Sequence, residues 1–576
     1  MNTRFTTRLL AVVLTVLMVP YAFAQKKAEK IEELMRQYVE NRQFNGTVLV
    51  AENGKVIVKK GYGLANMEWN IPNTPDTKFR LGSVTKQFTA FLIMQLVDQG
   101  KLKVSEKITT YLPDYPKATG DKITVHHLLT HTSGIPNYTN FPRFFETMSR
   151  DPYAPEAFVK KFSDLPLDFE PGSKFSYSNS GYFLLGVLIE KVTGKPYATV
   201  LQEGILTPAK LKDTGYDLSG PILPKRAAAY EKRGGGYVNA PYLDMTIPYA
   251  AGSLYSTVED LYRWDQLLYT DQLLSAASKK ALFTPALAHY AYGWGVGNAK
   301  IGQRKDSVLI VSHGGGINGF NTQFTRIPND KHTVILLNNT GGTVLGAIQA
   351  NILNILYDQP YEKPKKSIAT ALRQTLATAS LEKALQQFLQ LKTDKAYSLN
   401  EDEMNELGYD LMREGKMKEA LAVFNLNVEA YPQSSNVYDS RGEAYLKNGD
   451  KELAIKDYKK SVELDPRNTN GVEVLKTMGE KVAGPKDATV SAEILEKYVG
   501  KYELAPTFSI TVTRTDTQLF AQATGQDRFE LFPESETKFY LKVVPAQVTF
   551  VKDEKGQVTQ LVLHQNGRDI PGKRIP

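Results

Sequence analysis

Strand-like runs of residues stand at both ends of the first 340 positions, and mostly helical patterns and loops lie between them. At residues 47–60, two apolar runs are joined by Asn53-Gly54, a dipeptide that suits a tight hairpin turn. Three further runs, SVLIVSH, FNTQFTRI and HTVILLNN, follow residue 306. Strands this far apart are expected to join one sheet, because each needs partners to be buried. We therefore predict one α/β domain over residues 25–362.

A second pattern repeats with a period of 34 residues between Glu406 and Pro466. The matched positions are Gly408 and Gly442, Gly415 and Gly449, Ala420 and Ala454, Phe424 and Tyr458, and Pro432 and Pro466. Small residues where two helices meet, aromatic residues on the second helix and a closing proline resemble tetratricopeptide repeats. Two repeats cannot bury their faces alone, so we expect helices at 380–392 and 472–481 to cap them. With the charged, proline-bearing linker before it, this module is predicted over residues 363–485.

The last part of the chain, residues 486–576, alternates polar and apolar residues in short runs. These runs are broken by the turn-like segments TGQD, PESE, DEKG and QNGRD. Such spacing predicts a small antiparallel β domain, either a barrel or a sandwich. No grouping of catalytic residue types is visible in it.

The N-terminal residues 1–24 have the pattern of a secretory signal peptide. Arg4 and Arg8 precede an apolar stretch from Leu9 to Val19, and small residues follow. The apolar part is short for a membrane span, so we expect cleavage before Gln25 and an exported chain, periplasmic or secreted. The other apolar runs have strand length, so no transmembrane segment is predicted in the mature chain.

The composition excludes several classes of chemistry. With no cysteine, the chain has no disulfides, no thiolate nucleophile and no thiolate metal ligands. The formal net charge of +8, with no arginine-rich stripe, argues against nucleic acid as a partner. His127 and His131 are four residues apart, but no glutamate follows His127 as a zinc-binding H-E-x-x-H motif requires. We predict neither a metal nor a cofactor, and expect the histidines to pack a helix end.

A serine and a lysine three positions apart occur at Ser83-Lys86, Ser380-Lys383 and Ser535-Lys538. Only Ser83 follows FRLGS and opens an apolar helical pattern. At a helix start the serine's backbone N–H has no helical partner and can help to stabilise an oxyanion. A lysine buried one turn further on loses solvation, which favours its neutral form and lets it act as a base. The alternative is an ordinary N-cap beside a surface charge.

Two further motifs stand in the same segment. Tyr177-Ser178-Asn179 precedes an apolar helical pattern, and His313-Gly314-Gly315 ends a strand-like run. In this order and context the residues resemble the serine β-lactamase and penicillin-binding-protein superfamily, in its class C β-lactamase and esterase branch. The segments LLTHTSGIPNY, AAGSLYSTVEDLYRWDQLL and YGWGV also look like landmarks of that family. The resemblance covers residues 25–362 and implies an antiparallel sheet flanked by helices, together with a helical region.

The resemblance also implies roles for the motif residues. Ser83 would attack a carbonyl carbon, Lys86 would remove the hydroxyl proton, and Tyr177 would assist as phenolate or proton relay. The substrate would be bound by Asn179, His313, Gly315 and Gly316. The oxyanion would accept hydrogen bonds from the backbone N–H groups of Ser83 and of Gly316, which is expected on an edge strand.

Other matches to these motifs are interpreted as parts of loops and turns rather than of the site. Tyr138-Asn140 and Tyr237-Asn239 are interpreted as loop turns, Lys232-Arg233-Gly234 as a surface loop with no strand before it, and Glu170 as part of a turn.

The sequence therefore predicts an exported serine hydrolase that forms an acyl-enzyme with an ester, an amide or a D-amino-acid peptide. It would be an esterase, a D-peptidase or a weak β-lactamase. Strong β-lactamase activity is disfavoured because His313 stands where lactamases usually have a lysine, and histidine is largely neutral near pH 7. The alternative is a catalytically inactive envelope scaffold. In either case the repeats could bind a protein partner.

Overall fold

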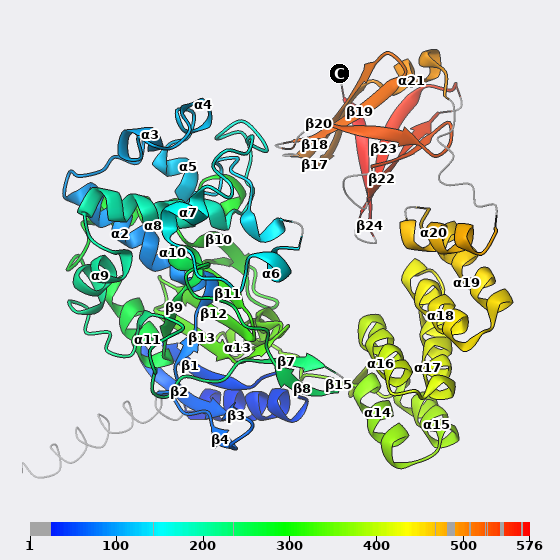
Figure 1. The fold of residues 1–576 in the computed structure, drawn as a ribbon, viewed down its shortest axis with the longest axis horizontal. Coiled ribbons are helices and arrows are strands. Elements are labelled where there is room, and N and C mark those ends of the chain that lie inside the picture. The colour runs from blue at the N-terminus through cyan, green and yellow to red at the C-terminus, as the bar shows by residue number, and fades with distance from the viewer. Residues whose placement is uncertain are drawn as a thin grey trace, which may run out of the picture. The chain divides into compact units, whose positions relative to one another are not determined.

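The computed structural model describes residues 25–141, 143–233, 235–466, 468–480, 490–505, 508–524, 526, 528–541, 546–553, 555–565 and 568–575 (Figure 1). The chain divides into two compact units, one ending at Lys366 and the other beginning at Ser367. The signal peptide predicted at 1–24 lies outside the described residues. No described helix combines the length and the apolar character needed to cross a membrane.

The first unit is built on a six-stranded antiparallel sheet with strand order β10-β11-β12-β13-β1-β2. Its strands are β1 (Gly46–Glu52), β2 (Lys55–Tyr62), β10 (Gly295–Lys300), β11 (Ser307–Ile317), β12 (Phe320–Ile327) and β13 (His332–Asn338). Leu49 of β1 stands opposite Ile335 of β13, so the two ends of the segment meet in the sheet as predicted. Asn53 and Gly54 both have positive φ, at 51° and 73°, which is the backbone of the predicted hairpin turn.

Both faces of this sheet are covered, and alternate residues of each central strand belong to different cores. Val48 and Val50 pack with a helix at residues 25–40 and with α13 (Leu345–Leu356). Leu49 and Ala51 face the larger core, which includes helices α2 (Thr85–Asp98) and α11 (Val258–Leu267). Because both faces are buried, the middle of β13 is a continuous apolar run, residues 334–337, and every residue of the strand is buried.

A helical region lies beside the sheet. Its long helices α2 and α8 (Asn179–Thr193) pack against each other and against α10 (Tyr249–Gly252). The shorter helices are α3 (Ile108–Tyr111), α4 (Lys117–Gly120), α5 (Val125–Leu129), α6 (Phe144–Thr147), α7 (Pro155–Val159), α9 (Tyr197–Leu201) and α12 (Ala276–Leu282). The first unit also has short strands outside the main sheet: β3 (Leu64–Asn66), β4 (Ile71–Pro72), β5 (Phe79–Arg80), β6 (Gly215–Tyr216), β7 (Tyr230–Arg233), β8 (Gly236–Asn239), β9 (Leu254–Ser256) and β14 (Thr340–Gly341).

The second unit begins with paired helices, as the 34-residue period predicts. They are α14 (Ile368–Thr378), α15 (Leu381–Leu391), α16 (Glu401–Arg413), α17 (Met417–Ala430), α18 (Ser435–Asn448), α19 (Lys451–Leu464) and α20 (Thr469–Thr477), and short strands β15 (Lys366–Ser367) and β16 (Tyr397–Ser398) pair with each other. A Cβ on Gly408 would lie 2.6 Å from the ring of Phe424, and one on Gly442 would lie 3.2 Å from Tyr458. The repeated glycine therefore gives the aromatic side chain of the next helix room to pack.

The rest of the second unit is a closed eight-stranded barrel, one of the two predicted forms. Helix α21 (Ala492–Tyr498) precedes β17 (Gly500–Ala505), β18 (Phe508–Thr515), β19 (Gln518–Ala523), β20 (Arg528–Pro533), β21 (Lys538–Tyr540), β22 (Ala546–Lys552), β23 (Val558–Gln565) and β24 (Arg568–Ile575). Pairing of β17 with β24 closes it, and alternate residues such as Ile510 and Val512 fill the interior.

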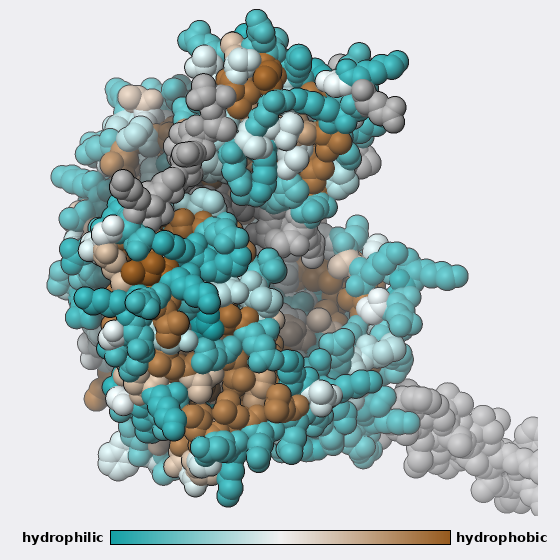
Figure 2. All heavy atoms as spheres, turned by 90° about the vertical axis from the view of Figure 1, so that its right-hand side faces the viewer, coloured by the Kyte–Doolittle hydropathy of each residue, from teal (hydrophilic) through white to brown (hydrophobic). Residues whose placement is uncertain are grey.

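Figure 2 shows one face of the whole molecule, on which hydrophobic residues occur in groups among hydrophilic ones.

Candidate active site

Ser83 lies in a short 3₁₀ helix, Gly82–Val84, which leads directly into α2. Gly82 has a φ of 53°, and a Cβ there would come within 2.9 Å of the backbone of Gly316. Only glycine permits both this backbone conformation and this close approach. The turn brings Ser83 to the end of strand β11.

Lys86 is completely buried, because α2 is surrounded by the core rather than lying on the surface. Its Nζ lies 3.1 Å from Ser83 Oγ, 2.8 Å from Asn179 Oδ1 and 2.9 Å from the carbonyl oxygen of Ala251. Burial lowers the pKa of Lys86 well below its usual value.

Only one of these three neighbours can donate a hydrogen bond to Lys86. The oxygens of Asn179 and Ala251 can only accept hydrogen bonds, whereas the Ser83 hydroxyl can also donate one. A neutral amine satisfies all three: its two N–H groups donate to the two carbonyl-type oxygens, and its lone pair receives the Ser83 O–H. The contacts therefore fit a lysine that is ready to accept the serine's proton.

Asn179 is fixed at the first position of α8, where its backbone N–H donates to Asn137 Oδ1 at 3.1 Å. Tyr177 stands two residues earlier, with its ring centroid 4.9 Å from Lys86 Nζ. Its hydroxyl is buried and makes no hydrogen bond of normal geometry. Burial raises the pKa of Tyr177, and the nearby Ser83 hydroxyl offsets only part of this rise. Tyr177 is therefore a neutral phenol rather than a phenolate.

The H-x-G motif lies on β11, but this strand is not at the edge of the sheet as the sequence led us to expect. Strand β10 pairs with β11 on its outer side, and its first residue, Gly295, lies opposite Ser312. From His313 to Ile317, β11 consequently pairs only with β12, and its other side faces Ser83. A Cβ on Gly315 would lie 2.0 Å from the carbonyl oxygen of Leu81, so only glycine allows the strand this close.

His313 is held by two hydrogen bonds rather than directed at open solvent. Its Nδ1 lies 2.6 Å from the carbonyl oxygen of Gly314, which can only accept, so Nδ1 carries the proton. Its Nε2 then accepts from the Tyr290 hydroxyl at 2.8 Å. Burial, together with the nearby Lys86, lowers the pKa of His313 to about 4. His313 is therefore neutral at physiological pH.

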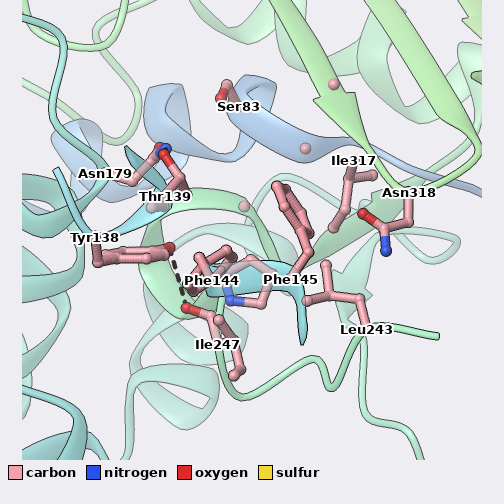
Figure 3. Close-up of a pocket in the computed structure, with 15 residues that line it drawn as sticks. Ser83, Tyr138, Thr139, Phe144, Phe145, Asn179, Leu243, Ile247, Ile317 and Asn318 are labelled. Carbon is pink, nitrogen blue, oxygen red and sulfur yellow. Dashed lines mark hydrogen bonds between the residues drawn. The ribbon is translucent and has the colours of Figure 1, made fainter. Parts of the chain in front are cut away.

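A pocket of about 130 Å³, partly open to solvent, lies against Ser83 (Figure 3). Ser83, Asn179 and Gly316 line it together with apolar side chains. Those side chains belong to Phe144, Phe145, Leu243, Ile247, Pro248 and Ile317. The site thus combines a serine, a buried amine and backbone from residues 82–83 and 316 beside one apolar cavity.

The structure brings together all the residues predicted for the site: Ser83, Lys86, Tyr177, Asn179, His313, Gly315 and Gly316. It adds Ala251, Tyr290 and His131, which were not assigned to the site. His131 is fully buried against Tyr177, with ring centroids 4.1 Å apart. Of these, His131 and Ala251 lie in segments noted only as family landmarks, and Tyr290 lies just before the landmark YGWGV.

The other motif matches have structural roles. His127 forms a capping box with Thr124 at the start of α5, as expected for a helix end. Glu170 is exposed, and its carbonyl oxygen accepts from the N–H of Ser173 in a turn. Lys232 and Arg233 are exposed as predicted, but they end strand β7 rather than lying in a loop. Gly234 lies outside the described residues.

The interpretation of Tyr138 as part of a loop turn was incomplete. Tyr138 begins a 3₁₀ helix, Tyr138–Asn140, and its ring lines the pocket. Its hydroxyl donates to the carbonyl oxygen of Ile247 at 3.1 Å.

The fold and this arrangement of residues are those of the β-lactamase family of serine hydrolases, and the comparison with known proteins agrees. The sequence profile of the beta-lactamase family matches residues 31–358, and the chain belongs to this family. Within the second unit, residues 440–468 match a tetratricopeptide repeat, and residues 484–574 match a domain of unknown function, DUF3471.

Penicillin-binding protein 4* of Bacillus subtilis is 32% identical over 379 residues, which is 60% of this chain and 82% of that protein. Teichoic acid D-alanine hydrolase of Staphylococcus aureus is 30% identical over 338 residues, covering 56% and 76% of the two chains. The fold also matches D-amino acid amidase of Ochrobactrum anthropi SV3, with a TM-score of 0.50, 23% identity, and coverage of 59% and 98%.

Proposed function

We propose that this protein is an active serine hydrolase that cleaves esters or amides through an acyl-enzyme on Ser83. The position of Lys86 carries this proposal. Its Nζ has two obligate acceptors and one hydroxyl within 3.1 Å, an arrangement that favours removal of the Ser83 proton. An inactive scaffold would have no need to bury an amine in these contacts.

In the first half of the reaction, Ser83 Oγ attacks the substrate carbonyl carbon while its proton moves to Lys86 Nζ. The negative charge that develops on the carbonyl oxygen is stabilised by backbone N–H groups of Ser83 and Gly316. The bond to the leaving group then breaks, and the proton passes from Lys86 to the departing oxygen or nitrogen. Tyr177, as a neutral phenol, suits the role of relay in this transfer.

In the second half, water attacks the ester of Ser83. Lys86 Nζ accepts the water proton, directly or through Tyr177 as relay, the bond between the acyl group and Oγ breaks, and the proton then passes from Lys86 to Ser83 Oγ. Asn179 keeps Lys86 in place through its Oδ1 and can offer its amide N–H groups to the substrate. Only residues of the first unit take part.

The neutral His313 favours ester and amide hydrolysis over strong β-lactamase activity, since it supplies no fixed charge for a substrate carboxylate. The names of the relatives, a penicillin-binding protein and a D-alanine hydrolase, support D-amino-acid esters or peptides as candidates. The signal-like N-terminus supports export to the periplasm or medium, which N-terminal sequencing of the mature protein would test by a start at Gln25.

The test is hydrolysis of p-nitrophenyl acetate by the full chain and by Ser83→Ala. We expect kcat/KM of the variant to fall at least about a thousandfold, as is usual when a catalytic nucleophile is removed. Ser380→Ala is the matched control, because Ser380 has the same S-x-x-K spacing but caps α15 in the second unit. Equal turnover by wild type and Ser83→Ala would refute the proposal.

A further inference from the structure

We propose that the pocket beside Ser83 selects substrates with an uncharged, apolar acyl group, and that Phe145 is a determinant of this selectivity. The inference rests on the proposed function and specifies its substrate class. It concerns the group that stays on Ser83 after acylation. Alkanoyl and arylacetyl esters or amides fit this description, whereas acyl groups that end in a carboxylate or an ammonium do not. Among D-amino-acid esters and peptides, the description fits those whose amino group is itself acylated.

The walls of the pocket are apolar on the side away from Ser83. Figure 3 shows the rings of Phe144 and Phe145 and the side chains of Leu243 and Ile247 gathered there, with Ile317 beside them. These side chains come from α6, from the loop before α10 and from the end of β11. Contact with these side chains would remove part of an apolar acyl chain from water.

The polar groups that line the pocket are few and mostly engaged. The Tyr138 hydroxyl donates to the carbonyl oxygen of Ile247, and Asn318 Nδ2 donates to the carbonyl oxygen of Pro241 at 2.9 Å. Thr139 and Asn179 contact each other at 3.4 Å. What remains can orient a carbonyl or amide, but it cannot surround an ion.

No charged residue is among those that line the pocket. The buried amine of Lys86 already has three hydrogen-bonding neighbours, and His313 is neutral with both ring nitrogens engaged. A carboxylate or ammonium on the acyl chain would give up its hydration without meeting an opposite charge. The pocket therefore disfavours charged acyl groups of either sign.

The geometry also indicates which part of the substrate enters the pocket. Ser83 and Asn179 line it, but Tyr177 and His313 do not. The leaving group must depart where a proton can reach it, and the proposed relay places that proton at Tyr177. The apolar pocket on the other side of Ser83 is then left for the acyl group.

Phe145 is the residue best suited to a test. Its side chain is 57% exposed although it lines the pocket, so substitution there should be tolerated by the fold. Its ring lies 5.1 Å from that of Phe144 and points toward Ser83 in Figure 3. Phe145→Arg would place a cation at this wall, and Ile222→Arg is the matched control, because Ile222 is 94% exposed and does not line the pocket.

The experiment uses three p-nitrophenyl esters with the same leaving group and chain length: hexanoyl, adipoyl with a free carboxylate, and 6-aminohexanoyl. Each kcat/KM is divided by the ester's rate of hydrolysis by hydroxide, which removes intrinsic reactivity. For the wild-type full chain we expect hexanoyl to exceed both charged esters at least tenfold. Phe145→Arg should raise the adipoyl-to-hexanoyl ratio at least tenfold, and Ile222→Arg should leave it unchanged.

Two failures can be told apart. If all three esters are hydrolysed through Ser83 at similar normalised rates, or if Phe145→Arg leaves the ratio unchanged, the acyl-pocket inference is wrong and the serine hydrolase assignment stands. If neither these esters nor p-nitrophenyl acetate is hydrolysed in a Ser83-dependent way, the proposed function is wrong, and the inference is overturned with it.

Discussion

The imidazole of His131 lies against the phenol ring of Tyr177, with 4.1 Å between the ring centroids. His131 Nδ1 accepts the backbone N–H of Ser178 at 3.1 Å, and its carbonyl oxygen accepts the N–H of Ser176 at 2.8 Å. The residues on both sides of Tyr177 are therefore tied to His131. The backbone of His131 has a φ of 57°, a conformation that asparagine tolerates better than alanine.

We predict that His131→Asn keeps more activity than His131→Ala. Asparagine adopts this φ at lower cost, and its side-chain oxygen can accept the N–H of Ser178. For His131→Ala we expect kcat to fall about tenfold or more with little change in KM, because Tyr177 loses its support while the acyl pocket is intact. Steady-state kinetics on p-nitrophenyl acetate measure this. Equal losses in the two variants would show that the contacts to the serines are not what positions Tyr177.

Lys86→Met should abolish turnover while largely keeping the packing of α2. Methionine has a similar length but no basic nitrogen, and it leaves the acceptors of Asn179 and Ala251 unpaired, at a cost of about 1–3 kcal/mol in stability. The expected loss in kcat/KM is at least about a thousandfold. Tryptophan fluorescence checks the fold, because Trp69, Trp264 and Trp294 all lie in the first unit. A folded Lys86→Met variant with substantial turnover would exclude Lys86 as the base.

The pH dependence of kcat/KM should follow Lys86. Since burial lowers the pKa of Lys86, its neutral form is present well below pH 10, and activity should rise with pH and level off before that point. Asn179→Asp would place a carboxylate 2.8 Å from Nζ, favour the ammonium and raise this pKa. The acid limb of the profile should then move to higher pH by about one unit or more. A limb that stays in place would mean that another group titrates there.

His313 should make the first unit less stable as the pH falls. Its pKa is about 4 in the folded protein and 6.5 when exposed, so the unfolded state binds the extra proton between these values. The stabilisation is complete above pH 6.5 and falls by about 3 kcal/mol by pH 4. Relative to His313→Gln, wild type should therefore lose stability over this window. Denaturant unfolding followed by tryptophan fluorescence gives the difference, and parallel curves for the two proteins would contradict it.

A chain that ends after Lys366 should keep its hydrolytic activity. Asn41 and Gln43 donate hydrogen bonds to the carbonyl oxygens of Pro364 and Lys365, so these last residues belong to the first unit. We expect kcat on p-nitrophenyl acetate within about tenfold of the full chain, or about 1.4 kcal/mol in barrier. A soluble, folded truncation without activity would show that the second unit contributes to the site.

Much of the fold and part of the site could be predicted because their signals are carried by side chains at fixed spacing. The strand β1, buried on both faces, appears in the sequence as an apolar run, and the glycine-aromatic pairs of the repeats appear as a 34-residue period. Ser83, Lys86, Tyr177 and Asn179 stand at short spacings before apolar helices, which makes them recognisable.

The features that could not be predicted have no such spacing. One of the two obligate acceptors beside Lys86 is the main-chain oxygen of Ala251, and a main-chain carbonyl does not depend on residue type. The walls formed by Phe145 and Leu243 come from loops whose paths depend on tertiary packing. The open side of β11 depends on where β10 begins, at Gly295, and not on any property of His313 or Gly316.

The most direct test of the central claim is to find the site of covalent modification. The full chain is treated with a fluorophosphonate, digested with trypsin and analysed by mass spectrometry. Ser83 lies in the tryptic peptide Leu81–Lys86, which contains no other serine. We expect one adduct per chain, located on this peptide and absent from Ser83→Ala. An adduct on a different peptide, or no adduct on a chain that hydrolyses p-nitrophenyl acetate, would contradict an acyl-enzyme on Ser83.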